Sequence, residues 1–169
     1  HLWSLGIEEQ FYIFWPIILW FAYKRNWTLS VVIGLIALSS FVLNIHLSNT
    51  GPASAFFLPL PRFWELAAGA LLAAMPKLMI RSTHTPLANI APHIASIAGA
   101  LLLLAGFYFI NKQSAFPGWW ALLPVSGAAL LIAAGPQSVF NRWVLSNRVM
   151  IWFGLISYPL YLWHWPIIV

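Results

Sequence analysis

The chain has 169 residues, of which 62% are hydrophobic and only 7% are charged, and its mean hydropathy is +0.84. Soluble domains carry about 25% charged residues, so this composition excludes a water-soluble globular domain. The formal charge of +5 could suggest a nucleic-acid partner, but the eight Lys and Arg residues are scattered singly or in pairs. Their distribution instead indicates positive charges at the ends of membrane helices. Because the chain has no cysteine, disulfides and thiolate metal sites are excluded, and we expect no metal site.

Six apolar stretches follow one another along the chain. A helix needs about 20 mostly apolar residues to cross roughly 30 Å of hydrocarbon, so the sequence predicts an all-α fold, a polytopic bundle of transmembrane helices in one domain. The expected spans are residues 7–23, 27–47, 56–75, 91–110, 119–134 and 149–169. Since the chain begins without Met and ends inside the last stretch, we expect it to be a fragment of a longer protein.

Positive charges are distributed unevenly over the connections between these stretches. The second and fourth connections hold Lys112 and, at the entrance to the third span, Arg62. The other three hold six basic residues, namely Lys24, Arg25, Lys77, Arg81, Arg142 and Arg148. The positive-inside rule predicts that these three connections are cytoplasmic and that both chain ends face outside. We therefore expect a multi-pass membrane protein.

The three acidic residues, Glu8, Glu9 and Glu65, all lie near the start of apolar stretches. Ionisable groups within membrane spans are costly and usually mark function. Glu8 and Glu9 could simply complement the positive end of a helix dipole. Tyr12 and Trp15, however, share a helical face with Glu8 and could pack around it. This spacing favours a functional role for Glu8, while both interpretations stay open for Glu9.

Arg62 and Glu65 are three residues apart, so they share one helical face and are expected to pair. The pair could merely lower the cost of inserting two charges, or it could belong to a substrate cavity. Gly69 and Ala73 continue the same face, with the small-residue spacing that lets helices pack closely in lipid.

The last stretch carries a polar stripe of Ser157, Tyr161 and His164 at helical spacing. His164 could be an interfacial anchor between two tryptophans, but the stripe favours function. In the predicted topology, His164 lies in the outer half of the bilayer together with Glu8 and the Arg62–Glu65 face. We expect these four residues to share one polar cavity.

Three motifs carry a resemblance to a known family. Residues 3–12 (WSLGIEEQFY), 62–69 (RFWELAAG) and 157–166 (SYPLYLWHWP) resemble the W-S-L-x-x-E-x-x-F-Y, R-x-W-E-L-x-x-G and S-Y-x-L-Y-L-W-H-x-P elements of the acyltransferase family 3 membrane proteins. The motifs occur in the family's order and span nearly the whole chain. The resemblance is to bacterial O-antigen acetylases of lipopolysaccharide, some of which carry an appended extracytoplasmic SGNH hydrolase-like domain.

The resemblance implies an enzyme that moves an acyl group, usually acetyl from acetyl-CoA, onto a hydroxyl of a cell-envelope carbohydrate. It implies an acyl-CoA donor, no covalently bound cofactor, and the lipid bilayer and the carbohydrate acceptor as partners, without nucleic acid. The family's catalytic His, ten residues after an Arg or Lys in its first span, and its R-x-x-R element would both precede His1. We therefore expect the fragment alone to be inactive.

The remaining roles are expectations on this basis. We expect Glu8 and His164 to support catalysis rather than initiate it. The residues expected to bind substrate are Arg62, Glu65, Tyr12, Tyr161 and Ser157. The residues alone do not exclude two other functions. One is a transporter or flippase of a lipid-linked sugar or small solute, with charges in a midplane cavity. The other is a structural membrane subunit whose charges join helices.

Overall fold

The computed structural model describes residues 3–74, 86–111 and 116–168, and most of these residues are helical. This confirms the all-α prediction. The α-helices are α1 (Trp3–Lys24), α2 (Leu29–Thr50), α3 (Pro52–Phe57), α4 (Phe63–Ala74), α5 (Pro86–Phe109), α6 (Leu122–Ala134) and α7 (Arg148–Ile168). Shorter turns are the 3₁₀ segments η1 (Leu60–Arg62) and η3 (Trp119–Ala121) and the π-helical turn η4 (Asn141–Leu145).

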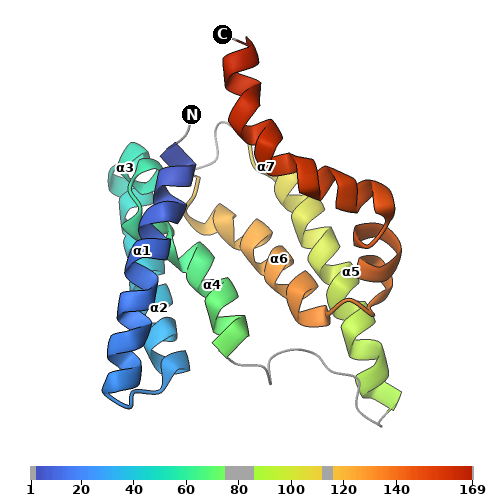
Figure 1. Cartoon of the computed structure of the whole chain (residues 1–169), viewed down its shortest axis with the longest axis horizontal. Coiled ribbons are helices and arrows are strands. Elements are labelled where there is room, and N and C mark those ends of the chain that lie inside the picture. Colours follow the sequence, from blue (N-terminus) through green and yellow to red (C-terminus); the bar gives the residue numbers. More distant parts are fainter. Residues whose placement is uncertain (1–2, 75–85, 112–115, 169) are drawn as a thin grey trace.

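The six longer helices alternate in direction (Figure 1). In that view α1, α4 and α6 run downward, whereas α2, α5 and α7 run upward, α7 obliquely. Lys24 is the last residue of α1 and Arg25 follows it, at the lower end of that helix. Lys77, Arg81 and Lys112, which also entered the charge count, lie outside the described residues.

Two helices of the described segments are long and apolar enough to cross a membrane, Leu29–Thr50 and Ile90–Phe109. The prediction of six spans is therefore not confirmed. With 12 and 13 residues, α4 and α6 are short; at 1.5 Å per residue such helices cover about 18–20 Å. The α1 helix carries Glu8, Glu9 and Lys24, and α7 is rich in Trp, Tyr and Pro, which lowers the hydropathy of both.

The predicted orientation can be tested at the two ends of α2. Asn26 and Asn49 are both exposed and flank this helix, and the chain contains no cysteine of its own. In spheroplasts, we expect Asn49→Cys to react with a membrane-impermeant maleimide and Asn26→Cys to react only after permeabilisation. Labelling of both positions from the same side would contradict the topology.

The core consists of two closely packed helix pairs, α2 with α4 and α5 with α6, and α4 joins them by packing on α6. At the α5–α6 crossing, a Cβ atom on Gly99 would lie 2.7 Å from the Gly127 carbonyl oxygen, and one on Gly127 would lie 2.9 Å from the Gly99 oxygen. The two backbones therefore touch, which only glycine permits.

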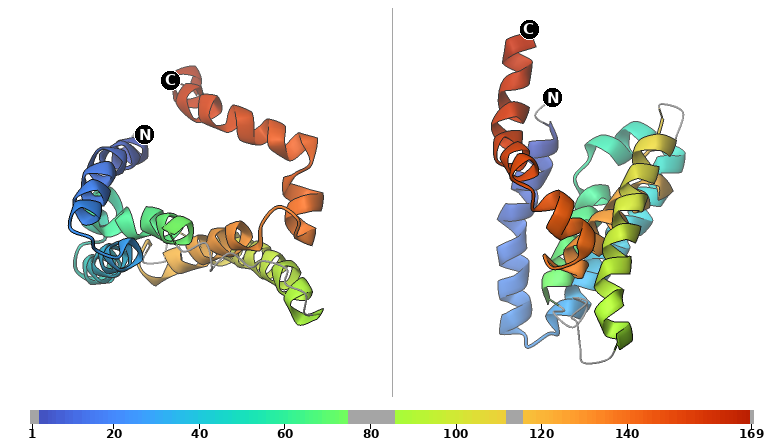
Figure 2. Two further views of the ribbon diagram at one scale, coloured as in Figure 1. Left: turned by 60° about the horizontal axis from the view of Figure 1, so that its bottom comes forward. Right: turned by 90° about the vertical axis from the view of Figure 1, so that its right-hand side faces the viewer.

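The last helix, α7, lies away from this core. It forms one end of an open arc of helices whose other end is α1 (Figure 2). Its main described packing partner is η4. Nearly every side chain from Arg148 to Leu160 is exposed, with Ile156 half-buried. The first turn of α1 and the last turn of α7 lie at the same end of the molecule.

The third predicted span, residues 56–75, is not one helix. The α3 helix ends at Phe57, and a regular helix resumes only at Phe63, after η1. Pro59 and Pro61 explain the break, because proline has no N–H to donate and its ring clashes with the preceding helical turn. The interruption places Arg62 at the start of a new helix rather than inside a continuous one.

Candidate functional site

Arg62 and Glu65 form a two-point ion pair at the start of α4. The Arg62 Nε donates to Glu65 Oε1 over 3.1 Å, and Nη2 donates to Oε2 over 3.0 Å. The side chains are 19% and 21% exposed. Bidentate guanidinium–carboxylate pairs are strong and geometrically specific, and each charge offsets the cost of holding the other among apolar helices. The pairing predicted from the three-residue spacing is confirmed.

Glu8 meets this pair at a small cavity between α1 and α4. The cavity measures about 60 Å³ and is lined by Ile7, Glu8, Arg62, Glu65 and Leu66. An apolar cavity of about 150 Å³ can hold a benzene ring, so this one has room for a group of only a few heavy atoms. Two of the motifs, more than fifty residues apart in the sequence, thus supply the charged groups of one cavity.

An aromatic contact one turn beyond Glu8 holds α1 against α4. The Phe11 ring is 6% exposed. It packs edge-on against Phe63, with centroids 5.4 Å apart, and stacks on Trp15 at 4.6 Å. Tyr12, which was expected to pack around Glu8, is 63% exposed and does not line this cavity. In this motif, Phe11 rather than Tyr12 makes the packing contact.

The ion pair also borders a second, larger cavity of about 380 Å³ between α4 and α6. Its other walls are mostly small or apolar: Ala68, Gly69, Phe116, Ala121, Pro124, Val125, Ala128, Ala129 and Ile132. Gly69, predicted to permit close packing of helices, lines this cavity instead. Arg62 and Glu65 thus stand between a small chamber beside Glu8 and a wider apolar one.

A stripe of polar residues on α2 supports the site, and the sequence-based reasoning missed it. Ser40, Asn44 and Ser48 are spaced by four residues and are all buried. Ser40 Oγ donates to the Leu60 carbonyl over 2.5 Å and accepts from the Trp64 N–H over 3.0 Å. Asn44 Nδ2 donates to the Pro61 carbonyl, and Ser48 Oγ accepts from the Gly118 N–H, both over 3.0 Å. The spacing of these three polar residues within an apolar helix was the sequence signal that could have revealed them.

The polar residues of the third motif lie on α7. His164 Nδ1 donates to the Tyr161 carbonyl of its own helix over 2.7 Å. Ser157 Oγ donates to the Gly154 carbonyl, also within the helix. None of the three residues of the predicted stripe lines either cavity. The expectation of one cavity shared by all four ionisable residues therefore holds only for Glu8, Arg62 and Glu65.

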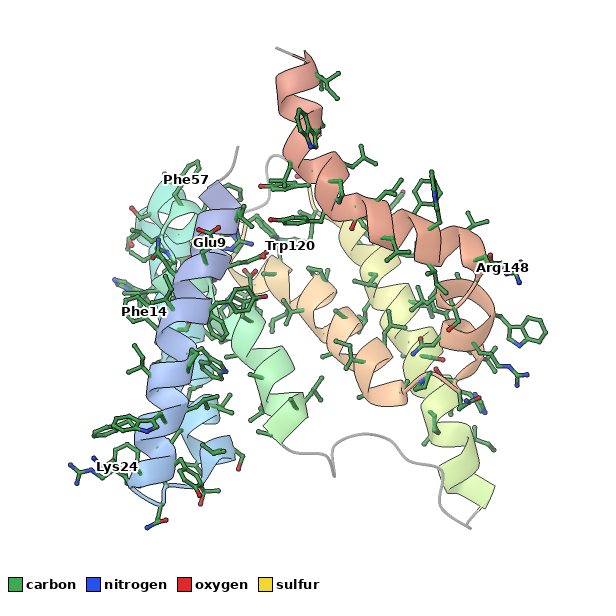
Figure 3. The ribbon with its side chains drawn as sticks, viewed as in Figure 1. Glu9, Phe14, Lys24, Phe57, Trp120 and Arg148 are labelled. Carbon is green, nitrogen blue, oxygen red and sulfur yellow. The ribbon has the colours of Figure 1, made fainter. Side chains whose placement is uncertain are left out.

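Figure 3 shows where Glu9, the neighbour of Glu8, lies in the bundle. Glu9 lies in the upper half of α1, at about the height of Trp120; Phe57 lies above it, and Lys24 lies at the lower end of α1. Glu9 is exposed and lines neither cavity. A helix dipole acts most strongly on charges in the first turn, and Glu9 lies beyond the first turn of α1. Among the residues that the structure describes, no group of three His, Asp or Glu side chains could hold a metal ion.

Comparison with protein families identifies the chain. The family described as "Acyltransferase domain" matches residues 1–169, which is the whole chain. The chain belongs to acyltransferase family 3. The resemblance seen in the three motifs is thereby confirmed, and the cavity beside Glu8 is built from two motifs of this acyltransferase.

Several curated bacterial proteins are similar to all 169 residues of this chain. One, named "Putative peptidoglycan O-acetyltransferase YrhL", from Bacillus subtilis, is 33% identical over 178 residues, covering 28% of YrhL. O-acetyltransferase OatA of Staphylococcus aureus is 29% identical, covering 29% of OatA. A Komagataeibacter xylinus protein named "Putative membrane-bound transacylase BcsY" is 32% identical, covering 41% of BcsY.

The chain thus spans less than a third of YrhL and OatA. No solved structure matches it. The names of these three relatives mention peptidoglycan, O-acetylation or transacylation. None of the three refers to the O-antigen or to lipopolysaccharide, so the expected likeness to O-antigen acetylases is not supported.

Proposed function

We propose that the chain is part of a membrane O-acyltransferase that moves an acetyl group from acetyl-CoA to a hydroxyl of a cell-envelope carbohydrate, in a bacterial cytoplasmic membrane. The observation that carries this proposal is the meeting of Glu8 with the Arg62–Glu65 pair around one small cavity. Family membership supports the reaction class. The name of YrhL makes peptidoglycan the first acceptor to test.

The chemistry requires a base and a stabilised anion. In the transfer, the acceptor oxygen forms a bond to the acetyl carbonyl carbon and the carbon–sulfur bond breaks. Coenzyme A leaves as a thiolate, and the hydroxyl proton, first taken by a base, ends on its sulfur. A hydroxyl is a poor nucleophile near neutral pH and needs a positioned base. The Glu8 carboxylate orients the hydroxyl or the base that takes its proton. Arg62, held in place by Glu65, faces the negative charge that develops on the carbonyl oxygen.

Two aromatic residues suit the acceptor. Tyr12, which is exposed, and Tyr161, which is half-buried, offer ring faces to a sugar, and Ser157 offers a hydroxyl one turn before Tyr161. His164 supports transfer through Nε2. These contacts require the acceptor to reach between α1 and α7, the two ends of the helix arc (Figure 2).

Glu8→Gln tests the site. The change removes the carboxylate charge but keeps the side chain's size, so we expect ester-linked acetate on the cell envelope to form about 10²-fold more slowly, as is typical of a lost acid–base group. The measurement is base-released acetate, with peptidoglycan and lipopolysaccharide assayed separately, in cells that express the protein from its own gene.

Glu9→Gln is the matched control, because Glu9 is the adjacent carboxylate and lies outside the cavity. We expect it to acetylate like the unsubstituted protein. His164→Ala tests the support from α7 in the same assay. Unchanged acetylation in both Glu8→Gln and His164→Ala would reduce the two residues to structural roles.

A further inference from the structure

We infer that Ser40 and Asn44 of α2 are positioning residues of this acyltransferase, because they fix the backbone of the 3₁₀ turn that presents the Arg62–Glu65 pair. The inference rests on the proposed function. It assigns a task to two buried residues that lie outside all three family motifs.

The Ser40 hydroxyl is inserted into the backbone of the turn. In an α-helix, the N–H of residue 64 would donate to the carbonyl of residue 60. Here the Trp64 N–H donates to Ser40 Oγ, and Ser40 Oγ donates to the Leu60 carbonyl. One hydroxyl from a neighbouring helix thus bridges the Trp64 N–H and the Leu60 carbonyl. The Leu60 carbonyl also accepts the Phe63 N–H, the shorter hydrogen bond of a 3₁₀ turn. The inserted hydroxyl therefore lies where this tighter turn passes into the regular helix of α4, and a side chain inserted in this way is a recognised cause of a local departure from α-helical geometry.

Asn44 fixes the next carbonyl along the chain. Its Nδ2 donates to the Pro61 oxygen, the carbonyl directly before Arg62, and the Asn44 side chain is completely buried. Asn44 therefore holds the peptide group directly before the Arg62 Cα, and Ser40 holds the peptide groups one residue further out on each side of it. With its backbone held on both sides, Arg62 can extend its guanidinium to Glu65 between the two cavities.

The third member of the stripe acts on the wall of the larger cavity. Ser48 accepts the Gly118 N–H, two residues beyond Phe116, which lines that cavity together with Arg62. One face of α2 therefore organises both the charged pair and the loop opposite it. A shift of about 1 Å in a reacting group can slow an enzyme about 10²-fold, so we expect the loss of these bonds to lower the rate of each folded molecule.

The test uses the protein expressed from its gene. The rate of acetylation is measured as acetate released from the cell envelope, and it is divided by the amount of folded protein solubilised in detergent. Ser40→Ala and Asn44→Leu remove the hydrogen bonds, whereas Ser40→Thr retains the hydroxyl. Ser39→Ala is the matched control, because the Ser39 hydroxyl is exposed and bonds only the Ile36 carbonyl of its own helix. Arg62→Lys, alone and combined with Ser40→Ala, tests whether Ser40 acts through Arg62.

We expect Ser40→Ala and Asn44→Leu to lower the rate per folded molecule about 10²-fold, Ser40→Thr to restore most of it, and Ser39→Ala to leave it unchanged. Because Ser40 acts through Arg62, adding Ser40→Ala to Arg62→Lys should cost much less than Ser40→Ala costs alone.

An unchanged rate per folded molecule in Ser40→Ala would overturn the inference, and so would fully additive effects in the double variant. Failure of the proposed function is a separate result, namely that deleting the gene leaves envelope acetate unchanged.

Discussion

Arg62→Ala is expected to slow envelope acetylation about 10³-fold, the upper end of the effect of removing one charge-stabilising group from an active site. It should also destabilise the protein, because Glu65 would keep its charge without its partner in the bundle. Breaking a buried ion pair costs about 3–5 kcal/mol, and since this pair is about one-fifth exposed, we expect a smaller loss, about 2–3 kcal/mol. Acetate release and the melting temperature in detergent measure the two effects.

The double variant Arg62→Met/Glu65→Met separates the two interpretations of the pair. Replacing a whole ion pair by apolar residues is often neutral or stabilising, so stability should return. If the pair takes part in transfer, activity should stay lost. Recovery of acetylation together with stability would show that the two charges only reduce each other's insertion cost.

Gly99→Ala is expected to destabilise the α5–α6 pair by about 3 kcal/mol, the upper range for forcing extra atoms into a packed core. Its Cβ would lie 2.7 Å from the Gly127 carbonyl oxygen, a backbone atom that cannot rotate away, so the helices would have to separate. For a protein of this size, 1 kcal/mol corresponds to about 2–4 °C in melting temperature, so a fall of about 10 °C should be measurable in detergent.

Gly34→Ala provides the control for this effect. Gly34 also lies inside a helix, but no atom lies within 4 Å of its Cβ position. Alanine favours a helix over glycine by about 0.5–1 kcal/mol, so the melting temperature should stay the same or rise slightly. Similar losses in both variants would mean that helix propensity, rather than the crossing, sets the effect at Gly99.

The sequence predicted the helices and the ion pair because both depend on local spacing. Long apolar runs gave α2 and α5 to within five residues at each end, and the three-residue interval between Arg62 and Glu65 gave their pairing. The break before Arg62 could also have been predicted, since Pro59 and Pro61 both disfavour a continuous helix. The long apolar run was instead interpreted as one span.

The supporting contacts could not be predicted in the same way. Ser40 and Asn44 have their spacing in the sequence, but their partners are the carbonyl groups of Leu60 and Pro61, which carry no residue-specific signal. The prediction that His164 shares the cavity was wrong for a different reason. The charge count predicts how deep a residue lies in the bilayer, but it does not predict which helices its own helix packs against, and α7 packs against η4.

The interrupted turn before α4 has a consequence for how the chain enters a bilayer. The 12 residues of α4 reach about 18 Å at 1.5 Å per residue, well short of the roughly 30 Å of hydrocarbon. Released alone from the translocon, this segment would expose the Pro61 carbonyl, the Trp64 N–H and two charges to lipid. With α2 already in place, Asn44 and Ser40 supply the hydrogen bonds to these two backbone groups. We therefore expect α4 to enter the bilayer together with α2, the earlier helix stabilising the later one.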